Sequence, residues 1–171
     1  MATRPLRQSA VGQKDDGRDQ LRLWLRLLAC TNLIESRVRS RLRKDFGTTL
    51  PRFDMLAQLD AASRSDDAPQ GLTMGELSRR LMVTNGNLTG LTERLVQEGL
   101  VRRKISAKDR RQQRVALTPQ GKRALAAMVT DHKRWIDEMF AGLDPQEVLQ
   151  LYQLVGRLKD SVQSSDGKAT S

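Results

Sequence analysis

The single cysteine and the single histidine of this 171-residue chain limit the chemistry that its side chains can perform. Cys30 has no second cysteine to pair with and His132 has no second histidine, so we expect neither a disulfide framework nor a metal site built on these residues. The sequence contains no glycine-rich phosphate loop, and its carboxylates stand mostly at helix starts or in loops, where structural roles suffice. The sequence therefore predicts a protein that is not an enzyme and that needs no metal and no cofactor.

A different set of side chains, short and polar, is concentrated between residues 84 and 94. Asparagine can bond adenine through both atoms of its amide, and threonine can contact a thymine methyl group or a phosphate. A helical glycine costs about 0.8–1.0 kcal/mol relative to alanine, which is tolerable where the backbone must approach a base closely. We expect this segment to read DNA bases through Thr84, Asn85, Gly86, Asn87, Thr89, Gly90 and Arg94, with Thr92 and Glu93 on the same exposed face.

Positive charge points to the same partner. The chain has 30 Lys and Arg against 20 Asp and Glu, a net charge of +10, which makes a polyanion the first partner to consider. Basic residues dominate positions 101–114, where Asp109 is the only acid. We expect the tip of this segment (Lys108, Asp109, Arg110 and Arg111) to contact DNA, with Asp109 orienting Arg111. Further phosphate contacts are expected from Arg52, Thr73, Arg79 and Arg103.

The spacing of apolar residues predicts the elements that position these side chains. Helical periodicity runs from Leu21 to Phe46 and stops at Gly47. Three shorter helices are predicted to begin near Thr49, at the capping box Thr73–Glu76 and at Thr84, with a loop over 61–71. The period changes to 2 over 100–105 and 114–117, which predicts a β-hairpin. Two helices follow, one from Thr118 and one from Asp144.

Two short helices followed by a hairpin predict a winged helix-turn-helix. The fold class is therefore mainly α with a small β-hairpin wing, flanked by long N- and C-terminal dimerisation helices. We expect an arm over 1–18, one domain over 19–163 and a polar tail over 164–171. Within the domain, 48–118 form the DNA-binding lobe, and 19–47 and 119–163 form the dimerisation helices.

Three motifs in this order give the chain a family resemblance. They are Leu72-Thr-Met-Gly-Glu-Leu-Ser78, then Glu98-Gly-Leu-Val-Arg-Arg103 with Asp109-Arg-Arg111, and finally Val115-Ala-Leu-Thr-Pro-Gln-Gly121. Together they resemble the wing and its flanks in the MarR family of transcriptional regulators, over residues 21–162. The chain departs from the family pattern in its longer 61–71 loop and in its glycine-containing recognition helix.

The resemblance implies a homodimer on a palindromic double-stranded operator, from which a small aromatic effector releases it. Residues 46–54 resemble members that answer to aromatic catabolites, including hydroxycinnamoyl-CoA thioesters. On this basis we expect a ligand-responsive regulator, a repressor of a catabolic or efflux operon. Asn32, His132 and Trp135 are the predicted ligand contacts, although a capped or surface histidine next to a core tryptophan is the simpler explanation.

Two alternatives remain open beside this reading. Cys30 could act as a thiol redox sensor within the same fold, and the protein could be a ligand-independent architectural DNA binder. The longest strictly apolar run, residues 27–30, is far short of the roughly 20 residues that span a bilayer, and the N-terminus has no secretory core. We therefore expect a cytoplasmic protein with no membrane partner.

Overall fold

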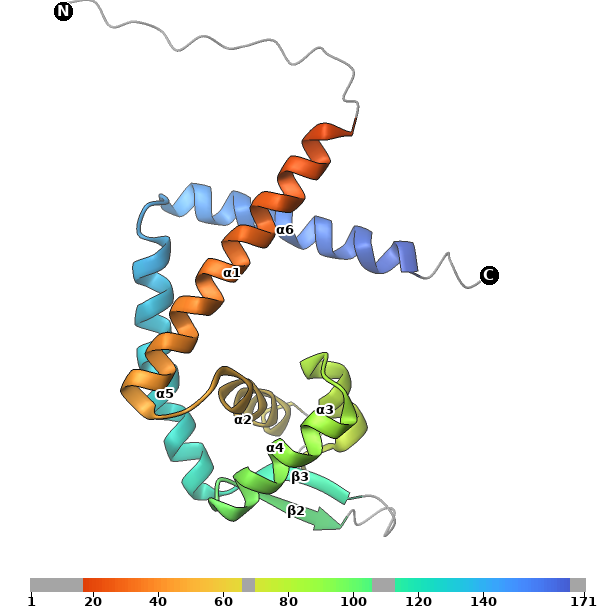
Figure 1. Ribbon diagram of the computed structural model, residues 1–171, viewed down its shortest axis with the longest axis vertical. Coiled ribbons are helices and arrows are strands. Elements are labelled where there is room, and N and C mark those ends of the chain that lie inside the picture. Colours follow the sequence, from red (N-terminus) through yellow and green to blue (C-terminus); the bar gives the residue numbers. More distant parts are fainter. Residues whose placement is uncertain (1–16, 66–69, 106–112, 167–171) are drawn as a thin grey trace, which may run out of the picture. The chain divides into compact units, whose positions relative to one another are not determined.

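The computed structural model describes residues 17–65, 70–105 and 113–166 and confirms a mainly helical chain with a small antiparallel sheet (Figure 1). In chain order the elements are α1 (Arg18–Phe46), α2 (Leu50–Ser63), β1 (Leu72–Thr73), α3 (Met74–Leu81), α4 (Asn85–Gln97), β2 (Val101–Ile105), β3 (Gln113–Leu117), α5 (Pro119–Phe140) and α6 (Pro145–Asp166).

The chain divides into two compact units within α1. The first ends at Arg37 and the second begins at Val38. In the described part of the first unit, the side chains of α1 are exposed or half-buried. The second unit contains the core, which includes Leu56, Leu77, Leu95, Val115 and Trp135.

A three-stranded sheet and three helices form the helix-turn-helix region. The strand order is β1-β3-β2, and both pairs are antiparallel. In the hairpin, Val101 lies opposite Leu117 and Arg103 lies opposite Val115. α3 packs against α2 and α4, and α4 lies alongside β2. The same packed group of helices and strands therefore holds both α4 and the β2–β3 hairpin in place.

Most helix ends follow the predicted capping chemistry. The capping box of α3 is present, and the Thr118 hydroxyl accepts a hydrogen bond from the backbone N–H of Gly121 at the start of α5. At the start of α6, the Asp144 carboxylate accepts from the backbone N–H of Glu147 at 2.9 Å. Gly47 and Gly99 follow α1 and α4 with φ of +59° and +71°, a region that glycine enters without strain.

Two predicted capping hydrogen bonds and two predicted boundaries need correction. Thr49 and Thr84 occupy N-cap positions, but neither side chain makes the predicted capping hydrogen bond. α2 continues through Ser63 instead of ending before residue 61, and α6 continues to Asp166, so the predicted tail begins inside a helix. The short strand β1 was not predicted. It exists because Leu72 and Thr73 pair with Val115 and Arg114 of β3, a non-local partner.

Candidate nucleic-acid interface

α4 presents one apolar face to the core and one polar face to solvent. Leu88 and Leu95 are fully buried, whereas Gly86, Asn87 and Arg94 are exposed. Of the other predicted base-reading residues, Thr84 and Thr89 are exposed and Gly90 is half-buried; for Asn85 only the backbone is described. A Cβ atom added to Gly86 or Gly90 would meet no atom within 4 Å. Internal packing therefore does not require glycine at either position.

The predicted exposed set contains one error. Thr92 is fully buried, with 0% of its surface accessible, and its hydroxyl donates a 2.7 Å hydrogen bond to the backbone oxygen of Leu88. It also lies 3.7 Å from the sulfur of Met74. Thr92 stands four residues after Leu88, so it falls on the buried face of the helix. Val96, one residue after the buried Leu95, is 37% exposed.

A surface hollow of about 500 Å³ lies where the start of α2 meets α4. Its lining includes Thr49 and Pro51 from α2 and Asn87, Leu91 and Arg94 from α4. No local sequence pattern predicts this hollow, because its lining comes from two regions that β1 and α3 separate along the chain. Two predicted DNA-reading side chains, Asn87 and Arg94, border it.

Beside α4, β2 carries three consecutive cations. Arg102 and Arg103 are exposed and Lys104 is half-buried. An Nη atom of Arg103 lies 3.8 Å from a carboxylate oxygen of Glu93 on α4, in an ion pair between two exposed side chains. The predicted wing-tip residues Lys108, Asp109, Arg110 and Arg111 lie outside the described residues, as does the proposed pairing of Asp109 with Arg111.

Two of the predicted phosphate contacts are engaged within the protein. Arg52 pairs with Glu98 and so ties α2 to the end of α4, while its Nε is buried without a hydrogen-bond partner. The Thr73 hydroxyl is part of the α3 cap. Arg79 is exposed, with its Nε 3.4 Å from the backbone oxygen of Gly75. The exposed Arg79 and Arg103 thus fit a phosphate role better than Arg52 and Thr73.

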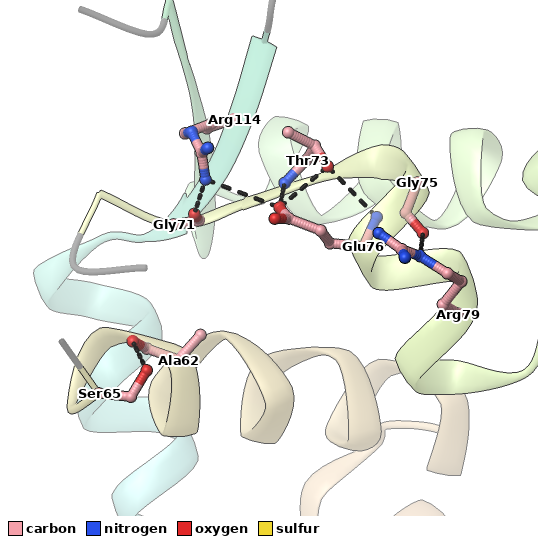
Figure 2. A network of polar contacts seen from close by, with 8 residues as sticks. All are labelled: Ala62, Ser65, Gly71, Thr73, Gly75, Glu76, Arg79 and Arg114. Carbon is pink, nitrogen blue, oxygen red and sulfur yellow. Dashed lines mark hydrogen bonds and ion pairs between the residues drawn. The ribbon is translucent and has the colours of Figure 1, made fainter. Parts of the chain in front are cut away.

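Figure 2 shows how the cap of α3 is joined to the base of the wing. Glu76 accepts a 2.7 Å hydrogen bond from the backbone N–H of Thr73, and Arg114 of β3 approaches the same carboxylate oxygen at 3.6 Å. Arg114 also donates to the backbone oxygen of Gly71 at 2.9 Å. The Thr73 backbone hydrogen bond is the main reason that the pKa of Glu76 lies below its ordinary value, with smaller contributions from the Thr73 hydroxyl, Arg114 and Arg79.

The predicted ligand contacts are distributed over both units. Asn32 is exposed in the first unit, so no site that combines it with His132 and Trp135 is described. His132 is half-buried and stacks at 4.9 Å on Phe53, and burial lowers its pKa. Trp135 is only 1% exposed and packs edge-on against Phe46 at 6.2 Å. Trp135 is thus a core residue that offers a ligand almost no accessible surface in this structure.

Within the described ranges, no three His, Cys, Asp or Glu side chains are grouped so that they could hold a metal ion. None of the helices in the described part of the chain is long and apolar enough to cross a membrane. Cys30 is exposed and takes part in no disulfide.

Comparison with known proteins places this architecture among bacterial regulators. The family model described as the MarR family matches residues 46–112, which span α2, the helix-turn-helix and the start of the hairpin. A MarR family transcriptional regulator from Silicibacter pomeroyi is 30% identical, and the match covers 88% of this chain and 99% of that one with a TM-score of 0.70.

Two other proteins match this chain, one in sequence over part of its length and one in fold. The transcriptional activatory protein BadR from Rhodopseudomonas palustris is 36% identical over 101 residues, which are 59% of this chain and 55% of BadR. A structure of Staphylococcus aureus MepR in complex with DNA is 18% identical and covers 80% of this chain and 93% of that one with a TM-score of 0.66, a likeness of fold. The family model, the regulator from Silicibacter pomeroyi and the helix-turn-helix with its wing all agree: this chain belongs to the MarR family of transcriptional regulators.

Proposed function

We propose that this protein binds a palindromic double-stranded operator as a homodimer and that a small-molecule effector changes its affinity for this DNA. The observation that carries the proposal is the outward face of α4, which is polar, unobstructed and placed beside the cations of β2. A B-DNA major groove about 12 Å wide admits one such helix. The neighbouring wing then lies close to the phosphates and the adjacent minor groove.

Asn87 is the base-reading residue that we propose with most support. Its side chain is exposed on α4, and its amide can both accept from and donate to adenine. Internal packing does not require glycine at the nearby positions Gly86 and Gly90, which supports a role for both in close approach to the duplex. Arg79 and Arg103 supply exposed cations for the phosphates.

A homodimer is supported by the apolar residues that the chain leaves exposed. Every described side chain of α6 is exposed, including Leu151, Val155 and Leu158. Such a stripe is typical of a surface that a second helix covers. A two-fold symmetric dimer would match a palindrome whose half-sites lie about one helical turn apart, at 10–10.5 bp.

The finer functional assignment rests on the resemblance described above. We propose a repressor of a catabolic or efflux operon that is released by an aromatic acid or its CoA thioester. Phe46 and Phe53, which belong to the stretch that resembles aromatic-responsive members, both lie in the cluster around His132 and Trp135. Because BadR is named an activatory protein, a transcription reporter with the operator is needed to distinguish repression from activation.

The direct test is selection of bound sequences from a random double-stranded DNA library. We expect a palindromic consensus, and we expect Asn87→Ala to lose about 1–3 kcal/mol of discrimination at particular base pairs while random DNA is bound as before. Gln153→Ala on α6, also an exposed polar residue, serves as the control. Equal losses on operator and random DNA would leave Asn87 as a phosphate or structural residue.

The same assay separates the two alternatives. A thiol sensor requires that oxidation changes operator affinity in the wild type and not in Cys30→Ser. An architectural binder requires that the selection returns no consensus and that no aromatic acid or CoA thioester changes its affinity.

A further inference from the structure

The outward face of α4 carries an acid as well as the polar residues already described. Glu93 and Arg103 lie 3.8 Å apart, with 58% of the Glu93 side chain and 41% of the Arg103 side chain exposed. This distance exceeds the 2.7–2.9 Å typical of a charge-assisted hydrogen bond. The pair is therefore a loose surface ion pair, of a kind that contributes little to stability and exchanges partners easily.

Within the described residues, neither helix capping nor the helix dipole accounts for an acid at this position. Glu93 stands in the third turn of α4, beyond the first turn, where a carboxylate would be stabilised by the helix dipole. It lies on the face opposite the buried Leu88 and Leu95 and makes no capping contact. On a surface that meets phosphates, a carboxylate opposes binding. The cation paired with Glu93 is Arg103, which we expect to contact the DNA backbone.

We infer that Glu93 is a specificity-determining residue that controls whether Arg103 is available to phosphate. On random DNA, Glu93 keeps its pairing with Arg103, and this cation contributes little to binding. Where the major groove presents the exocyclic amino group of cytosine, the Glu93 carboxylate accepts its hydrogen bond, and Arg103 is released to the backbone. A base contact thereby enables a phosphate contact.

The chemistry of the groove explains why the exchange is selective. Cytosine N4 and adenine N6 both donate a hydrogen bond, but adenine also presents the acceptor N7 beside its amino group, which repels a carboxylate; guanine N7 and O6 and thymine O4 only accept. The inference rests on the proposed DNA-binding function and goes beyond it, because it assigns one base preference to Glu93 and one regulated phosphate contact to Arg103.

The test is a double-mutant cycle on random DNA and on the selected operator. On random DNA we expect Glu93→Gln to raise affinity and to steepen the dependence of log K on log salt by about 0.9 for each freed arginine. In a protein that already carries Arg103→Gln, we expect Glu93→Gln to raise the affinity for random DNA much less. On the operator, Glu93→Gln loses the cytosine preference at one position of each half-site, on the order of tenfold. Asp137→Asn, which removes one exposed negative charge from α5, is the charge-matched control and leaves both values unchanged.

Three results would overturn the inference while leaving DNA binding intact. The first is the same gain for Glu93→Gln with and without Arg103, which would make Glu93 a general repulsive charge. The second is an unchanged affinity and salt slope on random DNA. The third is a cytosine preference that survives in Glu93→Gln. If the wild-type protein selects no consensus and binds no DNA, the proposed function itself fails, and the inference fails with it.

Discussion

Met82 combines a strained backbone with an exposed apolar side chain in the turn between α3 and α4. Its φ of +53° lies in the left-handed region, and 93% of its surface is exposed. A non-glycine residue pays about 1–2 kcal/mol for this conformation. Because the side chain is exposed, its removal costs the protein almost no packing. We therefore expect Met82→Gly to increase the free energy of unfolding by roughly 1 kcal/mol.

Met82→Ala is the matched control, because alanine removes the exposed side chain and keeps the strain. Urea denaturation should place Met82→Ala near the wild type and Met82→Gly above both. An equal increase in the two variants would mean that the exposed methionine, and not the backbone, limits stability.

Thr92 tests whether a polar residue of the recognition helix serves DNA or the core. Its hydroxyl is fully buried and bonded to the backbone of Leu88, so we expect Thr92→Val to cost about 1 kcal/mol of stability or less and to leave DNA affinity unchanged. Thr92→Lys would bury an uncompensated charge at a cost of about 3–5 kcal/mol and should prevent folding. Operator binding and thermal unfolding measure both outcomes. A folded Thr92→Val protein that has lost base discrimination would show that Thr92 reaches the duplex.

At the scale of elements, Glu76 joins the start of α3 to β3 and makes that junction sensitive to acid. Its pKa is lowered in the folded state from an ordinary value of 4.5. The native protein therefore holds this carboxylate ionised more strongly than the unfolded chain does. The resulting stabilisation is fully present above pH 4.5 and is lost as the pH falls through the lower folded-state pKa.

Glu76→Gln removes this titration and keeps a side chain that can still complete a capping box. We expect the wild type to be more stable than the variant at neutral pH and the difference to shrink towards about pH 3, as measured by urea denaturation. His132, by contrast, disfavours its charged form in the folded state, because burial lowers its pKa. Both proteins therefore lose the same stability as the pH falls below the ordinary His132 value of 6.5. A difference that stays constant with pH would assign the role of Glu76 to hydrogen bonding alone.

The same elements show which features a sequence can reveal. The capping box of α3, the cap of α6 and the change of period in the hairpin are local patterns, and the structure confirms them. The burial of Thr92 was missed because its hydroxyl suggested the polar face, although its place four residues after Leu88 puts it on the buried face. The strand β1 was missed because it depends on pairing with β3, a separate element. The Glu93–Arg103 pair was missed for the same reason, because the two residues belong to different elements.

Considered as a whole, the described part of the chain leaves many large apolar side chains exposed, and exposed apolar surface of this kind often marks an interface. In α6 the exposed apolar residues recur at intervals of three and four, and in α1 several large ones are exposed as well. The α6 residues are Val148, Leu151, Val155, Leu158 and Val162, and those of α1 include Leu21, Trp24, Leu25 and Leu28. A stripe with this spacing forms one face of a helix, which is the pattern that a partner helix covers.

Val155 stands in the middle of the α6 stripe, 44% exposed. If a second copy covers it, Val155→Glu places a charge in an apolar interface, and we expect a monomer at micromolar concentration and operator binding weakened by more than tenfold. Gln153→Glu introduces the same charge two residues away, on the opposite face of α6, and should remain dimeric and bind as the wild type does. Sedimentation velocity measures the first outcome and fluorescence anisotropy the second. A wild-type monomer under these conditions, or a Val155→Glu dimer, would show that the α6 stripe does not hold the two subunits together, and the symmetric operator proposed above would then need another source of symmetry.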